Sequence, residues 1–149
     1  MPARIIAVCK SDAKGVRKVP QCSVFLRQNY GLVDDAHADS NWHRQISLLA
    51  KESVEEMRKQ GLEVGPGDFA ENLTTEGIDL PSLPIGTRLQ AGEEVVLEIT
   101  QIGKECHMGC AVFREVGKCI MPKEGVFARV ILGGYIRPGD SISVIENGE

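Results

Sequence analysis

This chain has no long apolar run, no excess of basic residues and no tract of repeated or biased composition. It lacks the roughly eighteen consecutive apolar residues that a membrane-spanning helix requires. Its formal net charge of -4 at pH 7 argues against general nucleic-acid binding, which depends on a basic field around the phosphates. We therefore expect neither a membrane nor a nucleic acid as partner, while a small anion remains compatible with a local basic pocket.

We expect no secretory signal, because the N-terminal apolar run is short and a charged residue comes early. Five cysteines are an odd number, which fits poorly with an extracellular scaffold held by disulfides. We expect a cytoplasmic protein whose thiols stay reduced.

The length of 149 residues and a hydrophobic content of 42% predict one domain, residues 1–149, with a single core. Apolar and β-branched residues predict strands at 3–9, 21–28, 94–102, 126–132 and 141–145, with shorter extended pieces at 45–49 and 72–75. One helix is expected over 51–60, ended by Gly61. This pattern favours a mainly β fold, a closed or nearly closed β-barrel with few short helices.

Three of the cysteines cluster in the stretch ITQIGKECHMGCAVFREVGKCIMPKEG. Cys106 follows the longest alternating strand and has Lys104 and His107 beside it, so nearby positive charge should favour its thiolate. A thiolate can attack electrophiles, carry sulfur or bind a soft metal. Cys106 is the preferred functional thiol, with Cys110 and Cys119 as alternatives.

Two other interpretations of the cluster stay open. Cys106, His107, Cys110 and Cys119 have the ligand types of a structural zinc site, although their spacing is unusual for one. Cys106 and Cys110 could instead form the disulfide of a redox sensor. For the two cysteines in apolar strand runs, Cys9 and Cys22, burial as small apolar side chains is the favoured interpretation.

Cations that could bind an anionic ligand are scattered along the chain, and each of them is more often a surface side chain. Arg129 alternates with apolar residues in a predicted strand, so it is expected to point into the mouth of the barrel. His37 is a weakly supported pocket residue in an acidic turn, and the turn at 67–72 offers backbone amides and the amide of Asn72. The cationic candidates are Lys14, Arg17, Lys18, Arg27, Arg88, Lys123, Arg129 and Arg137.

The order of several segments resembles the MOSC domain family, named for the C-terminal domain of molybdenum cofactor sulfurase. They are GLVDDAHAD, RQISLLAKES, GDFAENLTTEGIDLPSLPIGTRLQAG, ITQIGKEC and EGVFARVILGGYIRPGD. The chain departs from the common pattern at 103–105, where relatives carry Arg and Pro before the cysteine. It also has Asp34-Asp35 where Gly-Asp is usual.

The resemblance implies a small stand-alone member with a MOSC-type β-barrel and the molybdenum cofactor, molybdopterin, as ligand. Cys106 then occupies the position that ligates molybdenum or carries persulfide sulfur for metal-sulfur cluster assembly. His37, Asn72, Arg88 and Arg129 become candidates for binding the phosphate-bearing pterin. Some members resemble reductases of N-hydroxylated compounds, so the enzyme class stays open between reductase and sulfur transferase.

The same resemblance implies a separate partner, because 149 residues cannot also hold a pyridoxal-phosphate cysteine desulfurase. Sulfur would come from such a desulfurase, whereas reduction would require an electron-donor protein. The alternative of a different class is a non-catalytic, zinc-stabilised β-barrel that binds a protein partner.

Overall fold

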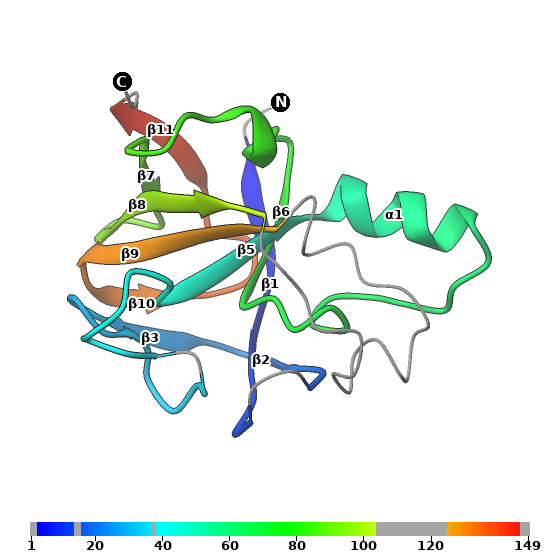
Figure 1. The fold of residues 1–149 in the computed structure, drawn as a ribbon, viewed down its shortest axis with the longest axis horizontal. Helices are drawn as coiled ribbons and strands as arrows, with labels where there is room; N and C mark the ends of the chain where they lie inside the picture. Colours follow the sequence, from blue (N-terminus) through cyan, green and yellow to red (C-terminus); the bar gives the residue numbers. More distant parts are fainter. Residues whose placement is uncertain (1–2, 14–15, 37, 104–124, 147–149) are drawn as a thin grey trace.

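The computed structural model describes residues 3–13, 16–36, 38–103 and 125–146. These residues form a mainly β structure with one α-helix and one short 3-10 helix, η1 (Leu80–Ser82) (Figure 1). The strands are β1 (Arg4–Lys10), β2 (Val19–Gln21), β3 (Val24–Arg27), β4 (Gly31–Leu32), β5 (Ile46–Ala50), β6 (Leu73–Glu76), β7 (Arg88–Ala91), β8 (Val95–Ile102), β9 (Val126–Leu132), β10 (Gly134–Ile136) and β11 (Ile142–Glu146).

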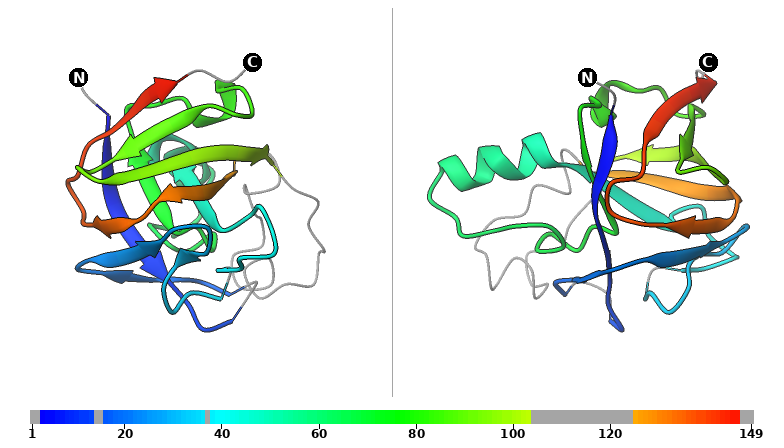
Figure 2. Two further views of the ribbon diagram at one scale, coloured as in Figure 1. Left: turned by 90° about the vertical axis from the view of Figure 1, so that its left-hand side faces the viewer. Right: turned by 180° about the vertical axis from the view of Figure 1, so that it is seen from behind.

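Eight strands form one sheet in the order β11-β7-β8-β9-β5-β6-β1-β2, and β10-β3-β4 form a second. The large sheet curves so that β11, at one edge, approaches β1, the strand before the other edge (Figure 2). An isolated bridge joins Arg4 to Ser141 there. The Ile5 amide donates to the Asp140 carbonyl at 2.7 Å on the same seam. The mainly β prediction is confirmed, but no ladder among the described strands closes the sheet into a barrel.

Two apolar cores lie on the two faces of the large sheet. The larger core joins both sheets through buried side chains such as Leu26 of β3, Leu48 of β5 and Leu97 of β8. In the smaller core, Leu49 of β5 and Phe127 of β9 pack with the helix and the 62–70 segment. Because both of its faces are covered, every residue of β5 is buried, including the polar Ser47.

The helix α1 (Lys51–Lys59) extends from the end of β5 and confirms the predicted 51–60 element (Figure 1). Val54 and Met57 are its buried apolar stripe. Gly61 has φ +95°, the left-handed conformation that a glycine adopts without steric cost just after a helix. Among the described residues, no helix combines the length and apolar character that a membrane crossing requires.

Two expectations about local structure are wrong. The predicted strands leave out residues 133–140, yet this stretch contains β10, which pairs with β3 from Gly134 to Ile136. Cys22 is exposed rather than buried, because it lies in the short connection between β2 and β3. Cys9 is buried, as predicted.

Candidate functional site

The cysteine-bearing segment leaves and rejoins the sheet between β8 and β9. These strands pair as far as Ile102 and Val126, and the Gly103 amide donates to the Gly125 carbonyl at 2.6 Å. Cys106, His107, Cys110 and Cys119 lie outside the described residues, so their roles stay predictions. Within the part of the chain that is described, no group of three or more His, Cys, Asp or Glu side chains could hold a metal ion.

A cavity with a volume of ≈ 430 Å³ lies along the β1–β2 hairpin. Lys10 and Arg17 supply positive charge to its lining, beside the polar side chains of Ser11, Asp12 and Gln21. Arg17 Nη1 lies 3.9 Å from Asp68 Oδ1, a partly exposed ion pair. We call this the hairpin cavity. Its two cationic side chains are of the kind that a small anion needs for binding.

A fully buried ion pair lies behind the hairpin. Lys18 Nζ donates to Asp35 Oδ1 at 2.8 Å and to Ser11 Oγ at 3.0 Å. Burial lowers the pKa of Lys18, and the hydrogen bond to Asp35 opposes that effect. Asp35 Oδ1 also accepts the Ser11 amide at 3.0 Å, and the Ala36 amide donates to the Ser11 carbonyl at 2.9 Å. The pair therefore fixes the loop that carries His37, itself outside the described residues, against the hairpin.

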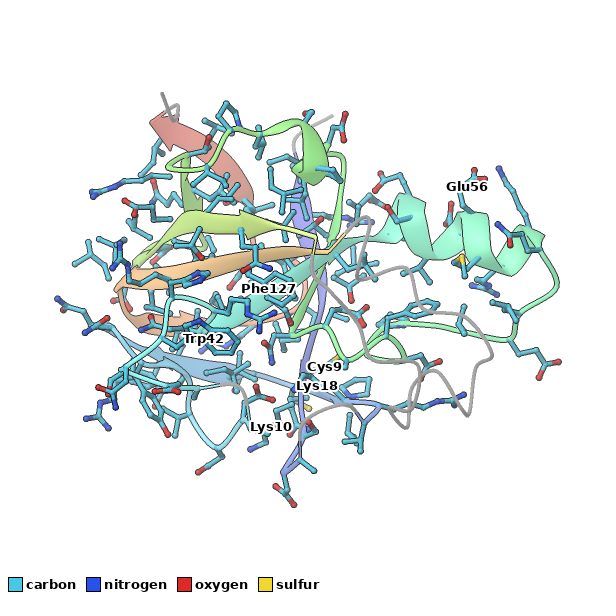
Figure 3. All side chains as sticks on the ribbon, viewed as in Figure 1. Cys9, Lys10, Lys18, Trp42, Glu56 and Phe127 are labelled. Carbon is cyan, nitrogen blue, oxygen red and sulfur yellow. The ribbon has the colours of Figure 1, made fainter. Side chains whose placement is uncertain are left out.

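A second buried carboxyl group, Glu71, lies next to this pair. It accepts the Thr74 hydroxyl at 2.9 Å and the Phe69 amide at 3.3 Å. Burial raises the pKa of Glu71 to about 7 although these hydrogen bonds favour its charged form. Burial, with a further contribution from Glu71, raises the pKa of the Cys9 thiol to about 12, so Cys9 is not a thiolate at neutral pH. Figure 3 shows Cys9 and Lys18 together beside β1.

Asn72 joins three strands from a fully buried position. Its Oδ1 accepts the Ser47 amide at 3.0 Å and the Ser47 hydroxyl at 3.1 Å, and its Nδ2 donates to the Cys9 carbonyl at 3.1 Å. These bonds connect β1, β5 and the start of β6. The structure thus places Asn72 in the framework of the site, apart from the two arginines predicted to act with it.

Those arginines, Arg88 and Arg129, lie together on adjacent strands and share one carboxylate. Glu98 accepts from Arg88 Nε at 3.2 Å and from Arg129 Nη2 at 3.0 Å. The neighbours of Arg129 in sequence, Ala128 and Val130, both belong to the larger core. Because side chains alternate along a strand, Arg129 lies on the opposite face. The expectation that it points into a barrel mouth is therefore wrong.

Sequence reasoning missed a third cationic feature, formed by the segment before β5. The guanidinium carbon of Arg44 lies 3.8 Å from the ring centroid of Trp42 and 5.2 Å from that of Phe127. Desolvation lowers the pKa of Arg44. Within the described part of the chain, its Nε is buried without a hydrogen-bond partner, as are His43 Nδ1 and Arg129 Nε. The clue in the sequence was the tryptophan of NWHRQ, the single one in the chain.

The MOSC domain family model matches residues 34–143, which is most of the chain and includes all the strands from β5 to β10. The chain belongs to the MOSC domain family. None of the curated proteins matches it.

Solved structures agree with this assignment at the level of the fold. The YuaD protein from Bacillus subtilis aligns with a TM-score of 0.81 and 19% identity, covering 100% of this chain and 98% of that one. YiiM from Geobacillus stearothermophilus gives 0.73 and 22%, covering 97% of this chain and 76% of that one. YiiM from Escherichia coli gives 0.72 and 18%, with 100% and 72% covered. At such low identity the likeness supports the MOSC fold alone.

Proposed function

We propose that this MOSC domain binds the molybdenum cofactor or carries sulfur, with Cys106 as the ligating or sulfur-bearing thiol. The observation that carries the proposal is the family match, whose residues 34–143 include Cys106. Chemistry supports it, because a soft thiolate suits both molybdenum and persulfide sulfur.

A phosphate-bearing pterin needs cations and N–H donors, and the described residues fit that need unequally. The hairpin cavity offers Lys10 and Arg17 to a phosphate, although Asp12 also lines it and Asp68 lies 3.9 Å from Arg17. Arg129 offers its unpartnered Nε, but Glu98 neutralises part of its charge. Arg88 pairs with the same Glu98, so it is the weaker of the two arginine candidates.

The other predicted residues that the structure describes hold the framework in place and do not contact a ligand directly in this proposal. Asn72 holds β1, β5 and β6 in register, and the Lys18–Asp35 pair fixes the His37 loop beside the hairpin cavity. A rigid framework of this kind reduces the entropy lost when a ligand binds. A bound cofactor supplies the redox chemistry, whereas the residues of this chain bind it, orient it and keep its surroundings dry.

The proposal leaves the protein dependent on a partner. As a sulfur carrier, it takes persulfide sulfur from a separate pyridoxal-phosphate cysteine desulfurase. As a reductase of N-hydroxylated compounds, it takes electrons from a separate donor protein. Both versions place the reaction at Cys106 in a cytoplasmic protein.

Metal and pterin analysis of protein made in cells that synthesise the cofactor tests the proposal. Molybdenum and pterin in equal amounts, lost in Cys106→Ser and retained in Cys22→Ser, would support cofactor binding. A mass increase of one sulfur atom on Cys106 after incubation with a desulfurase would support the carrier. Stoichiometric zinc that is lost together with the fold on chelation would overturn both in favour of the zinc-stabilised barrel.

A further inference from the structure

A second cavity, of ≈ 400 Å³, lies where α1 begins, and we call it the helix-start cavity. Its lining comes from the first turn of the helix and from the segment between β6 and η1, ending at Pro81. This volume lies within the range of pockets that hold small molecules, about 300–1,000 Å³. The helix-start cavity shares no lining residue with the hairpin cavity, so it is a separate place on the molecule.

The helix begins at this cavity without a side-chain cap. The N-cap position is usually a residue whose side-chain oxygen accepts an amide of the first turn. Here it is Ala50, and no side chain makes a capping hydrogen bond. The amides of a first turn have no acceptor one turn earlier in the helix, and the helix dipole adds partial positive charge to them. The start of α1 is therefore suited to an oxyanion of a ligand.

The hydroxyl group of Ser53 is an independent sign of a ligand. Ser53 lines the cavity and is only 9% exposed, yet among the described residues its hydroxyl forms no hydrogen bond. A hydroxyl removed from water normally finds a partner, because an unmade hydrogen bond costs free energy. A ligand oxygen in the cavity would accept this hydrogen bond, next to the amides of the first turn.

Two carboxylates in the same lining rule out a simple anion as the preferred ligand. Glu52 and Asp79 both line the cavity, and within the described part of the chain neither pairs with a cation. Glu52 Oε2 accepts the Gly77 amide at 3.0 Å, which fixes this carboxylate in the wall. Such groups attract an ammonium ion. Donors and carboxylates side by side thus match a ligand that carries both charges.

We propose that the helix-start cavity binds a free α-amino acid with an apolar side chain. The ligand carboxylate accepts hydrogen bonds from the Ser53 hydroxyl and from the amides of the first turn. The ligand ammonium group pairs with Asp79 and Glu52. Its side chain packs against Ile78 and Pro81, the larger apolar residues of the lining. This site does not depend on the molybdenum cofactor.

Calorimetric titration of the full chain with L-leucine tests the proposal. Isocaproate keeps the carboxylate and the apolar chain of leucine without the ammonium group, whereas leucinamide keeps the ammonium group and has a neutral amide in place of the carboxylate. We expect saturable binding of leucine that is about tenfold or more tighter than that of either control. In NMR spectra, leucine should shift the backbone amide resonances of Glu52 and Ser53.

Three variants probe the separate parts of the site. Ser53→Ala should weaken leucine binding several-fold, and Asp79→Asn by about tenfold, because the second change removes a charge-assisted contact. Ala50→Ser introduces a side-chain cap that competes for the first-turn amides. It should therefore weaken leucine binding several-fold while the protein stays at least as stable, which a purely structural role of this region does not predict.

Two further variants are controls. Glu56→Gln removes another carboxylate of α1 (Figure 3), whose side chain is 65% exposed and lies outside the lining of the cavity. Cys106→Ser removes the thiol of the proposed cofactor site. Both should bind leucine as the parent protein does, and the second should do so even if the cofactor proposal fails.

Several results would overturn the proposal. Leucine that gives no saturable binding is one, and isocaproate or leucinamide that binds as tightly as leucine is another. Unchanged affinity in Ser53→Ala or in Asp79→Asn would also contradict it, as would lost affinity in Glu56→Gln. Amide shifts that leave out Glu52 and Ser53 would place the amino acid elsewhere. Circular dichroism on every variant separates lost binding from lost folding.

Discussion

Lys18 and Arg44 are both cations partly or wholly removed from water, and the fold satisfies them in opposite ways. Lys18 is 2% exposed and donates to Asp35 and Ser11. Arg44 has two aromatic rings and no described hydrogen-bond acceptor. A compact ammonium needs acceptors when buried, whereas a planar guanidinium can shed water against rings and keep its N–H edge free. The comparison separates a cation that a buried carboxylate neutralises from one that packs against aromatic rings.

Removing the buried ammonium should have the largest effect on stability. Lys18→Met leaves the Asp35 carboxylate buried without its partner, and we expect a loss of about 3–5 kcal/mol in the free energy of unfolding, measured in urea. Arg4→Met is the control, because Arg4 pairs with Glu76 at 3.0 Å but its side chain is 58% exposed. That change should remain below about 1 kcal/mol. Equal losses in the two variants would contradict a framework role for Lys18.

The carboxyl group beside Lys18 should make stability depend on pH. Because the folded state raises the pKa of Glu71 from 4.5 to about 7, it holds this proton more tightly than the unfolded chain does. Stability contributed by Glu71 is therefore present below pH 4.5 and is lost as pH rises through 7, by up to about 3 kcal/mol. Glu71→Gln keeps the shape without the charge, so its unfolding free energy should vary less between pH 5 and pH 8. An unchanged pH profile in this variant would assign the dependence to another group.

The backbone at Gly67 approaches the backbone at Lys18 closely, and substitution of the glycine tests this contact. A Cβ on Gly67, at φ +85°, would lie 2.3 Å from the Lys18 carbonyl oxygen and 3.1 Å from Cys9 Sγ. Gly67→Ala should destabilise the protein by about 2–3 kcal/mol, combining steric clash with backbone strain. Gly61 has a similar φ of +95° with nothing within 4 Å, so Gly61→Ala isolates the strain, about 1 kcal/mol. Thermal melting of both variants measures the difference.

The smallest effect is expected at the shared carboxylate on the exposed sheet face. Arg129 and Glu98 form their ion pair at 3.0 Å with side chains 43% and 20% exposed. A double-mutant cycle of Arg129→Gln and Glu98→Gln should give a coupling of about 0.5 kcal/mol that declines with added salt. A coupling as large as the loss in Lys18→Met would remove the distinction between the buried and the exposed ion pairs.

Much of the fold could be predicted, because local pattern and tertiary environment agree in the long strands. Residues 126–132 form β9 as predicted, and 94–102 differs from β8 by one residue. Prediction failed where glycines occur in a strand: Gly134 has φ +153° and lies outside the predicted strands, yet it pairs with Leu26. The ladder that includes it depends on β3, which lies far away in sequence.

The candidate site was less predictable, since burial of polar residues depends on partners that come from distant segments. Lys18 looks like a surface cation in sequence, and Asp35, seventeen positions later, makes its burial tolerable. Asn72 was recognised, but its three bonds to Ser47 and Cys9 make it part of the framework. The contact between Arg44 and Phe127 forms only because β5 pairs with β9.

The seam between β1 and β11 has a kinetic consequence. Arg4 and Ser141 meet across almost the whole described chain, and the bridge between them is isolated from any longer ladder. Joining segments so distant in sequence carries a large loop-closure entropy, and few neighbouring bonds offset it. We expect the pairing of β1 with β11 to form last during folding, and its amide hydrogens to exchange with solvent first.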